Sequence, residues 1–123
     1  MTMLGAREGT LSGLRKLVAA AMARDLRVFV LPGPEIARAH RLDLSAAGLQ
    51  MVASPRHASV LLVVGDMPPT LLTAATVVYA QMMRPRALFV LGDGKTGALP
   101  PADVRAPLSP EGLVAGVVQL RDA

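Results

Sequence analysis

Four short runs of apolar residues divide the chain, and a proline or a glycine follows each of them closely. The runs are Leu26–Leu31, residues 49–53, Val60–Val64 and Ala87–Leu91. Val60–Val64 is an unbroken run of branched aliphatic side chains, which is typical of a strand that is buried on both faces of a parallel sheet. The pattern therefore predicts four strands.

Segments that predict helices lie between and around these strands. They cover residues 11–23, residues 35–41, residues 69–83 and Pro110–Arg121. Ser109 is placed to cap the last helix, because a serine hydroxyl can accept from helix N–H groups and Pro110 suits the first helical position. Residues 92–107 are rich in Gly and Pro, which predicts a long loop.

Strands that alternate with helices indicate an α/β fold. We expect a flavodoxin-like three-layer sandwich around a four-stranded parallel sheet in the order 2-1-3-4. The length of 123 residues fits one domain, so a single α/β domain over residues 1–123 is expected. In such sheets, ligands bind beyond the carboxyl ends of the strands. Those ends are predicted at residues 32–35, 54–57, 65–69 and 92–97.

The composition limits both the core and the partners. Only 2% of the residues are aromatic, while 52% are apolar, so the core must consist of aliphatic side chains and methionine. The net charge is +4, but the basic residues are dispersed and few aromatic rings are present to stack on bases. This pattern argues against nucleic acid as a partner.

Several features favour a cytoplasmic location. The chain has no cysteine, which excludes disulfides and thiolate metal sites and fits a reducing compartment. Residues 1–14 show neither the apolar run nor the cleavage site of a secretory signal. Residues 58–83 are apolar, but Gly65 and the Pro68-Pro69 pair would leave backbone groups unpaired inside a membrane. A strand, a turn and a helix are expected there instead.

Four charged residues at the predicted strand ends are candidates for lining a crevice: Glu35, Asp66, Asp93 and Lys95. Asp66 and Asp93 end neighbouring strands and could together bind Mg²⁺, but helix-terminal charge and loop solvation explain them more simply, so no metal is expected. Lys95 belongs to a Gly-Lys-Thr sequence, yet Phe89 stands where a phosphate-binding Walker loop needs a glycine. A turn is expected there, and anion binding by its backbone N–H groups stays open.

A second group of residues suits a surface that contacts another protein. The group comprises Ser54, Arg56, His57, Tyr79, Met82 and Met83. Ser54 and His57 form part of a hydrolase triad pattern, but no carboxylate is placed to orient the imidazole, so an interface role is expected for this segment. The two methionines close the helix predicted over residues 69–83. They are interpreted either as core filler or as an adaptable docking patch.

Several of these motifs occur together in a known family. Ser54-Pro55-Arg56 and the strand of residues 60–65 are followed by Tyr79-Ala80-Gln81-Met82, Pro85-Arg86 and Leu91-Gly92. In this order and spacing they resemble the cluster-bearing B subunit of complex I, an NADH:quinone oxidoreductase, and the N-terminal domain of [NiFe]-hydrogenase small subunits. The resemblance is strong over residues 53–93, weaker over residues 107–120 and faint before residue 50.

In that family, four cysteines at the strand ends bind a [4Fe–4S] cluster, whose iron atoms need thiolate ligands. The resemblance places these cysteines near Pro32 and Gly33, at Met67, at Gly94 and around Leu108. None of these side chains can supply a thiolate. The resemblance therefore implies that the cluster is lost and that the chain carries no cofactor.

The resemblance implies a cluster-less structural or regulatory subunit that docks on a larger oxidoreductase or hydrogenase-like subunit and is not catalytic by itself. Association with a membrane would then be peripheral and would come only through such partners. One alternative is a functional subunit of an NADH:quinone oxidoreductase-type respiratory complex. Another is a stand-alone protein that binds a small molecule or a nucleotide in the strand-end crevice.

Overall fold

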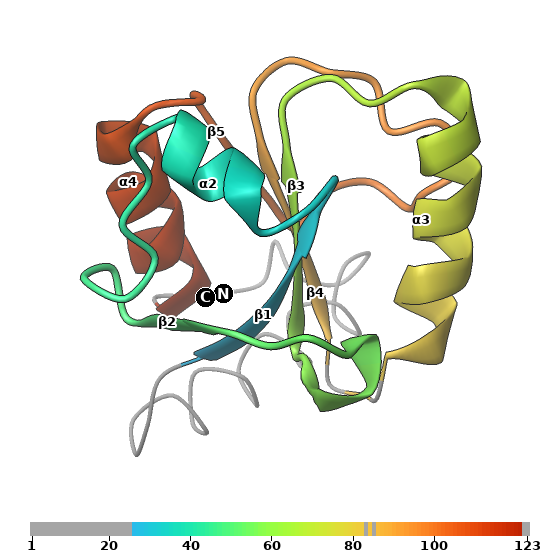
Figure 1. Cartoon of the computed structure of the whole chain (residues 1–123), viewed down its shortest axis with the longest axis horizontal. Coiled ribbons are helices and arrows are strands. Elements are labelled where there is room, and N and C mark those ends of the chain that lie inside the picture. The colour runs from blue at the N-terminus through green and yellow to red at the C-terminus, as the bar shows by residue number, and fades with distance from the viewer. Residues whose placement is uncertain (1–25, 83, 85, 122–123) are drawn as a thin grey trace, which may run out of the picture.

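A computed structural model describes residues 26–82, 84 and 86–121 of the chain (Figure 1). The strands are β1 (Leu26–Leu31), β2 (Leu49–Met51), β3 (Val60–Val64), β4 (Ala87–Leu91) and β5 (Val104–Ala106). The helices are α2 (Glu35–Ala39), the 3-10 turn η2 (Pro55–His57), α3 (Pro69–Gln81) and α4 (Pro110–Arg121). The helix predicted over residues 11–23 lies outside the described residues. Within the described part, no helix is long and apolar enough to cross a membrane.

The sheet has five parallel strands in the order β2-β1-β3-β4-β5. The α/β class is therefore confirmed, but the predicted count of four strands is wrong. β5 lies within the segment that was predicted to be a loop. It was missed because a strand of three residues near Pro101 and Pro107 is too short to show an alternating pattern. It extends the predicted order 2-1-3-4 by one edge strand, and 2-1-3-4-5 is the strand order of flavodoxin-like sheets.

The helices cover both faces of the sheet, which gives three layers (Figure 1). α2 and α4 cover one face, where the largest buried side chain is Phe89 of β4. α3 covers the other face, over Leu61 and Val63 of β3. All five residues of β3 and all five of β4 are buried, as expected for strands that lie between two helical layers.

The short strand β2 determines where the following segment lies. β2 pairs only with the first half of β1, from Leu26 beside Leu49 to Val28 beside Met51, and β3 starts at the same level of the sheet. The chain therefore passes from β2 to the amino end of β3, where the N–H of Ser59 donates to the carbonyl of Arg27 at 2.9 Å. η2 lies at this amino end, so the prediction that residues 54–57 share an edge with residues 65–69 and 92–97 is wrong.

Ser109 caps α4 as its sequence position predicts. Its Oγ accepts a hydrogen bond of 2.9 Å from the N–H of Gly112. We expect Ser109→Ala to lower the free energy of unfolding by about 1 kcal/mol, because an N–H group of the first turn then loses its partner. Urea unfolding followed by circular dichroism measures this loss. Ser109→Asp should keep most of the stability, and an unchanged midpoint for Ser109→Ala would contradict the assigned cap.

Candidate functional site

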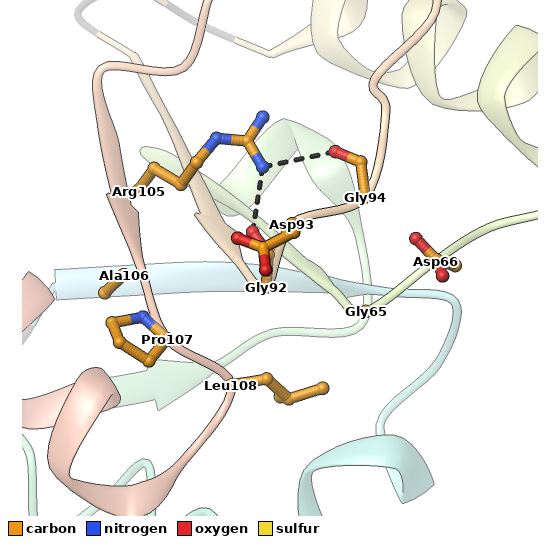
Figure 2. Close-up of a pocket in the computed structure, with 9 residues that line it drawn as sticks. All are labelled: Gly65, Asp66, Gly92, Asp93, Gly94, Arg105, Ala106, Pro107 and Leu108. Carbon is orange, nitrogen blue, oxygen red and sulfur yellow. Dashed lines mark hydrogen bonds between the residues drawn. The ribbon is translucent and has the colours of Figure 1, made fainter.

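A crevice opens at the carboxyl ends of β3, β4 and β5 and has a volume of about 720 Å³. Figure 2 shows the residues that line it, which are Gly65, Asp66, Gly92, Asp93, Gly94, Arg105, Ala106, Pro107 and Leu108. Two of the predicted crevice residues, Asp66 and Asp93, come together there with exposed carboxylates. Lys95 lines an adjoining depression of about 550 Å³, and Glu35 lines neither of these two spaces.

Two glycines let the strand ends come close together at the base of the crevice. Gly65 has a φ of 72° and Gly92 has a φ of 110°, which are conformations that side chains disfavour. Their N–H groups continue the sheet, since Gly65 donates to Leu91 at 2.9 Å and Gly92 donates to Ala106 at 2.8 Å. A Cβ on Gly92 would lie 3.6 Å from the Cα of Gly65. The crevice therefore begins directly beyond the last backbone hydrogen bonds between the strands.

Arg105 is a crevice residue that the sequence did not single out. It lies in the middle of β5, and its side chain reaches over the loop that follows β4 (Figure 2). Its Nη1 donates to the carbonyl of Gly92 at 2.8 Å and to that of Gly94 at 3.1 Å. The two bonds fix both the guanidinium and the loop. Only a prediction of β5 could have brought this residue to the site, because a single arginine in a loop carries no signal of its own.

The positions that the resemblance assigns to cluster cysteines do not all line the crevice. Only Gly94 and Leu108 line the crevice. Met67 is 8% exposed and packs into the core on the α3 face, so its thioether is turned away from solvent. Pro32 is exposed, and a Cβ on the buried Gly33 would meet the carboxylate of Glu35.

A ligating side chain at position 94 would be crowded by its neighbours. A Cβ there would lie 2.5 Å from Oδ1 of Asp66, 3.1 Å from the carbonyl oxygen of Gly65 and 3.2 Å from the Cα of Asp66. The last two are backbone atoms, which cannot swing aside as a side chain can. Together with the absence of cysteine from the sequence, this packing means that the residues present do not fit a [4Fe–4S] cluster.

The predicted interface residues gather at the opposite, amino end of the sheet, where η2 contacts α3. Arg56 and His57 are exposed, and the half-buried Ser54 accepts a long hydrogen bond of 3.4 Å from the N–H of Arg56. Met82 is only 3% exposed and belongs to the core, so it does not present its side chain to a partner. Met83 lies outside the described residues. An interface here would rest on Arg56, His57 and the half-buried Tyr79.

Arg86 holds the end of α3 against Tyr79. Its Nη1 donates to the carbonyls of Tyr79 and Met82 at 2.7 and 3.3 Å, and its guanidinium carbon lies 4.5 Å from the centre of the Tyr79 ring. These contacts satisfy carbonyls that the last turn of a helix leaves unpaired. Burial raises the pKa of the Tyr79 phenol, and the negative charge of Asp103 raises it further, while the charge of Arg86 lowers it.

The phenol is expected to titrate above the ordinary pKa of 10.0. Tyr79 is the only tyrosine and the chain has no tryptophan, so phenolate absorbance reports this one group. Because Arg86 favours the phenolate, Arg86→Gln should raise the pKa further, whereas Arg38→Gln on the distant helix α2 should leave it unchanged. A pKa raised by folding stabilises the fold below the unfolded pKa, and this contribution is lost as pH rises through the folded pKa. A lower pKa in Arg86→Gln would contradict this placement.

Among the described residues, no three His, Cys, Asp or Glu side chains are grouped so that they could hold a metal ion. Comparison of the sequence with protein-family models gives no match, and comparison with curated proteins gives no significant match. The motifs of residues 53–93 and the geometry of the two ends of the sheet therefore carry the functional argument.

Proposed function

We propose that the chain is a cluster-less structural or regulatory subunit that docks on a larger oxidoreductase- or hydrogenase-like subunit. The packing around Gly94 is the observation that carries this proposal. At the crevice position where the resembling family has a cluster cysteine, a Cβ would crowd the backbone of residues 65 and 66 at 3.1 and 3.2 Å and would displace the carboxylate of Asp66. A site in which a ligand position is this crowded supports a scaffold role more than electron transfer.

The surface proposed to dock is the amino end of the sheet, around η2. Arg56 and His57 are exposed there on a segment whose sequence, Ala53-Ser54-Pro55-Arg56, is among the strongest parts of the resemblance. η2 contacts both β1 and α3, so these side chains stand on a supported turn. In this proposal the subunit carries no cofactor, is cytoplasmic and reaches a membrane only through its partner.

Purification of the tagged chain from its native host tests the proposal. We expect a co-purifying protein that resembles the large subunit of a hydrogenase or of complex I, together with neither iron nor acid-labile sulfide on this chain. Arg56→Glu should reduce recovery of that partner, while the matched charge reversal Arg38→Glu, on the exposed side of α2, should not. Stoichiometric iron and sulfide on the chain, or recovery of the chain without such a partner, would contradict the proposal.

A second candidate function is the binding of a small molecule at the carboxyl ends of the strands. The crevice of about 720 Å³ and the fixed guanidinium of Arg105 favour it. Ligand pockets of this size commonly combine a shaped cavity with a few polar groups held in place. This function needs no partner subunit, so a chain that is recovered alone but binds a ligand would support it over docking.

A further inference from the structure

We propose that the depression formed by residues 93–97 and Arg105 binds a phosphoryl group. It adjoins the crevice, has a volume of about 550 Å³ and is lined by Asp93, Gly94, Lys95, Thr96, Gly97 and Arg105. The two spaces share Asp93, Gly94 and Arg105. This site is at the carboxyl ends of the strands, whereas the proposed docking surface is at the amino end of the sheet. The two proposals are therefore independent.

Backbone N–H groups are the first feature of the depression that suits an anion. Residues 94–96 have no regular secondary structure, and within the described part of the chain the N–H groups of residues 94–97 donate no hydrogen bond. Four successive amides are therefore left for solvent or a ligand. Runs of unpaired backbone N–H groups form concave sites that bind anions. Gly94 is itself buried, whereas Gly97 is exposed and adds no side chain over the backbone of the loop.

Side-chain charge is the second feature of the depression that suits an anion. Lys95 is exposed, and Arg105 is held by the carbonyls of Gly92 and Gly94 through Nη1 alone. The guanidinium therefore keeps its other N–H donors for a ligand, in a position that is already fixed before binding. Asp93 lines the depression and the Asp66 carboxylate lies beside Gly94, so two carboxylates balance the two cations. The unpaired amides and the remaining guanidinium donors must therefore supply the net attraction for an anion. Both the fork of an arginine and the point charge of a lysine are suited to phosphate oxygens.

The ligand class follows from what the loop lacks. The segment is not a Walker loop, because Phe89 occupies the position of its first glycine and no helix starts at Thr96. Without a helix terminus or a second glycine-rich turn, the donors suit one phosphoryl group more than a chain of phosphates. Because the depression is continuous with the crevice through the shared residues, the organic part of a phosphate ester has space beyond Arg105.

Isothermal titration calorimetry of the full chain at low salt tests this site with inorganic phosphate, pyrophosphate and a nucleoside 5′-monophosphate. We expect phosphate to bind, and Lys95→Gln to weaken binding by about tenfold, the usual effect of losing a charge-assisted hydrogen bond. Arg105→Gln should weaken binding at least as much, but this arginine also braces the loop. Lys95→Gln, whose exposed side chain makes no hydrogen bond within the described residues, therefore carries the test if Arg105→Gln fails to fold.

The matched control is Arg84→Gln, which removes the same charge from an exposed residue just before β4, at the other end of the sheet. It should leave phosphate binding unchanged. Tighter binding of the monophosphate than of phosphate identifies a phosphate ester as the ligand, and equal binding identifies the free ion. No binding of any of the three compounds, or an equal loss in Arg84→Gln and Lys95→Gln, would overturn the proposal.

Discussion

Phe89→Ala is expected to lower the free energy of unfolding by about 3–5 kcal/mol, the range for removing a fully buried aromatic ring. Phe89 is 0% exposed and lies at the centre of β4. Its ring fits against Gly116 of α4, where a Cβ would overlap the ring atoms. The helix can approach the sheet this closely only because residue 116 has no side chain. Truncation at residue 89 therefore leaves a cavity that α4 cannot fill without moving its backbone. Urea unfolding followed by circular dichroism measures the loss.

Val118→Ala is the matched control for this prediction. Val118 lies on the outer side of the same helix and is 50% exposed, so its truncation should change stability by no more than about 0.5 kcal/mol. Gly116→Ala tests the contact from the other side and should cost about 1–3 kcal/mol through overpacking. Phe89→Leu should recover part of that cost in the double variant. A loss in Phe89→Ala as small as that in Val118→Ala would contradict the assigned core.

The strands that are buried on both faces could be predicted with their correct bounds. β3 and β4 carry unbroken apolar runs, because every side chain of a central strand meets one of the two helical layers, and β1 is apolar apart from Arg27. The end of α3 was less predictable. It ends at Gln81 and not at Met83, and Arg86 bonds to the carbonyls of its last turn. Such a contact depends on where β4 begins, and the sequence pattern of the helix itself does not reveal it.

The fifth strand was missed because its neighbours hold it in place more than its own sequence does. The N–H of Asp103 donates to the carbonyl of Leu88 at 2.9 Å, and the Asp103 carboxylate accepts from the N–H of Leu88 at 2.7 Å. This exchange aligns Val104–Ala106 with β4. An aspartate in a loop predicts a turn, and its role as a partner for a strand appears only in the folded structure.

Whether each strand was predicted correctly explains which site residues could be found from the sequence. Asp66 and Asp93 line one crevice because each follows a strand that was correctly predicted. Arg105 was overlooked because its strand was overlooked. The segment of Arg56 and His57 was expected at the wrong edge because a strand of only three residues, β2, does not cross the sheet. The position of a residue relative to a strand end is therefore informative only when the length of that strand is known.

Gly92→Ala is expected to cost about 1–3 kcal/mol, although space for a methyl group is available. A Cβ there would make ordinary contacts, at 3.6 Å to the Cα of Gly65 and 3.7 Å to the Cβ of Leu108. The cost comes from the backbone, since a φ of 110° lies outside the left-handed region that other residues tolerate. The residue cannot relax without losing bonds on both sides, because its N–H donates to Ala106 and its carbonyl accepts from Arg105, each at 2.8 Å.

Gly97→Asn separates this backbone cost from the general effect of replacing a glycine. Gly97 has a φ of 56°, which is within the left-handed region that asparagine visits, so this variant should lose less than about 1 kcal/mol. Chemical unfolding of the two variants compares them directly, and equal losses would contradict the assigned conformation of Gly92. Because the Gly92 carbonyl also anchors Arg105, Gly92→Ala should weaken phosphate binding even at temperatures where the variant is fully folded.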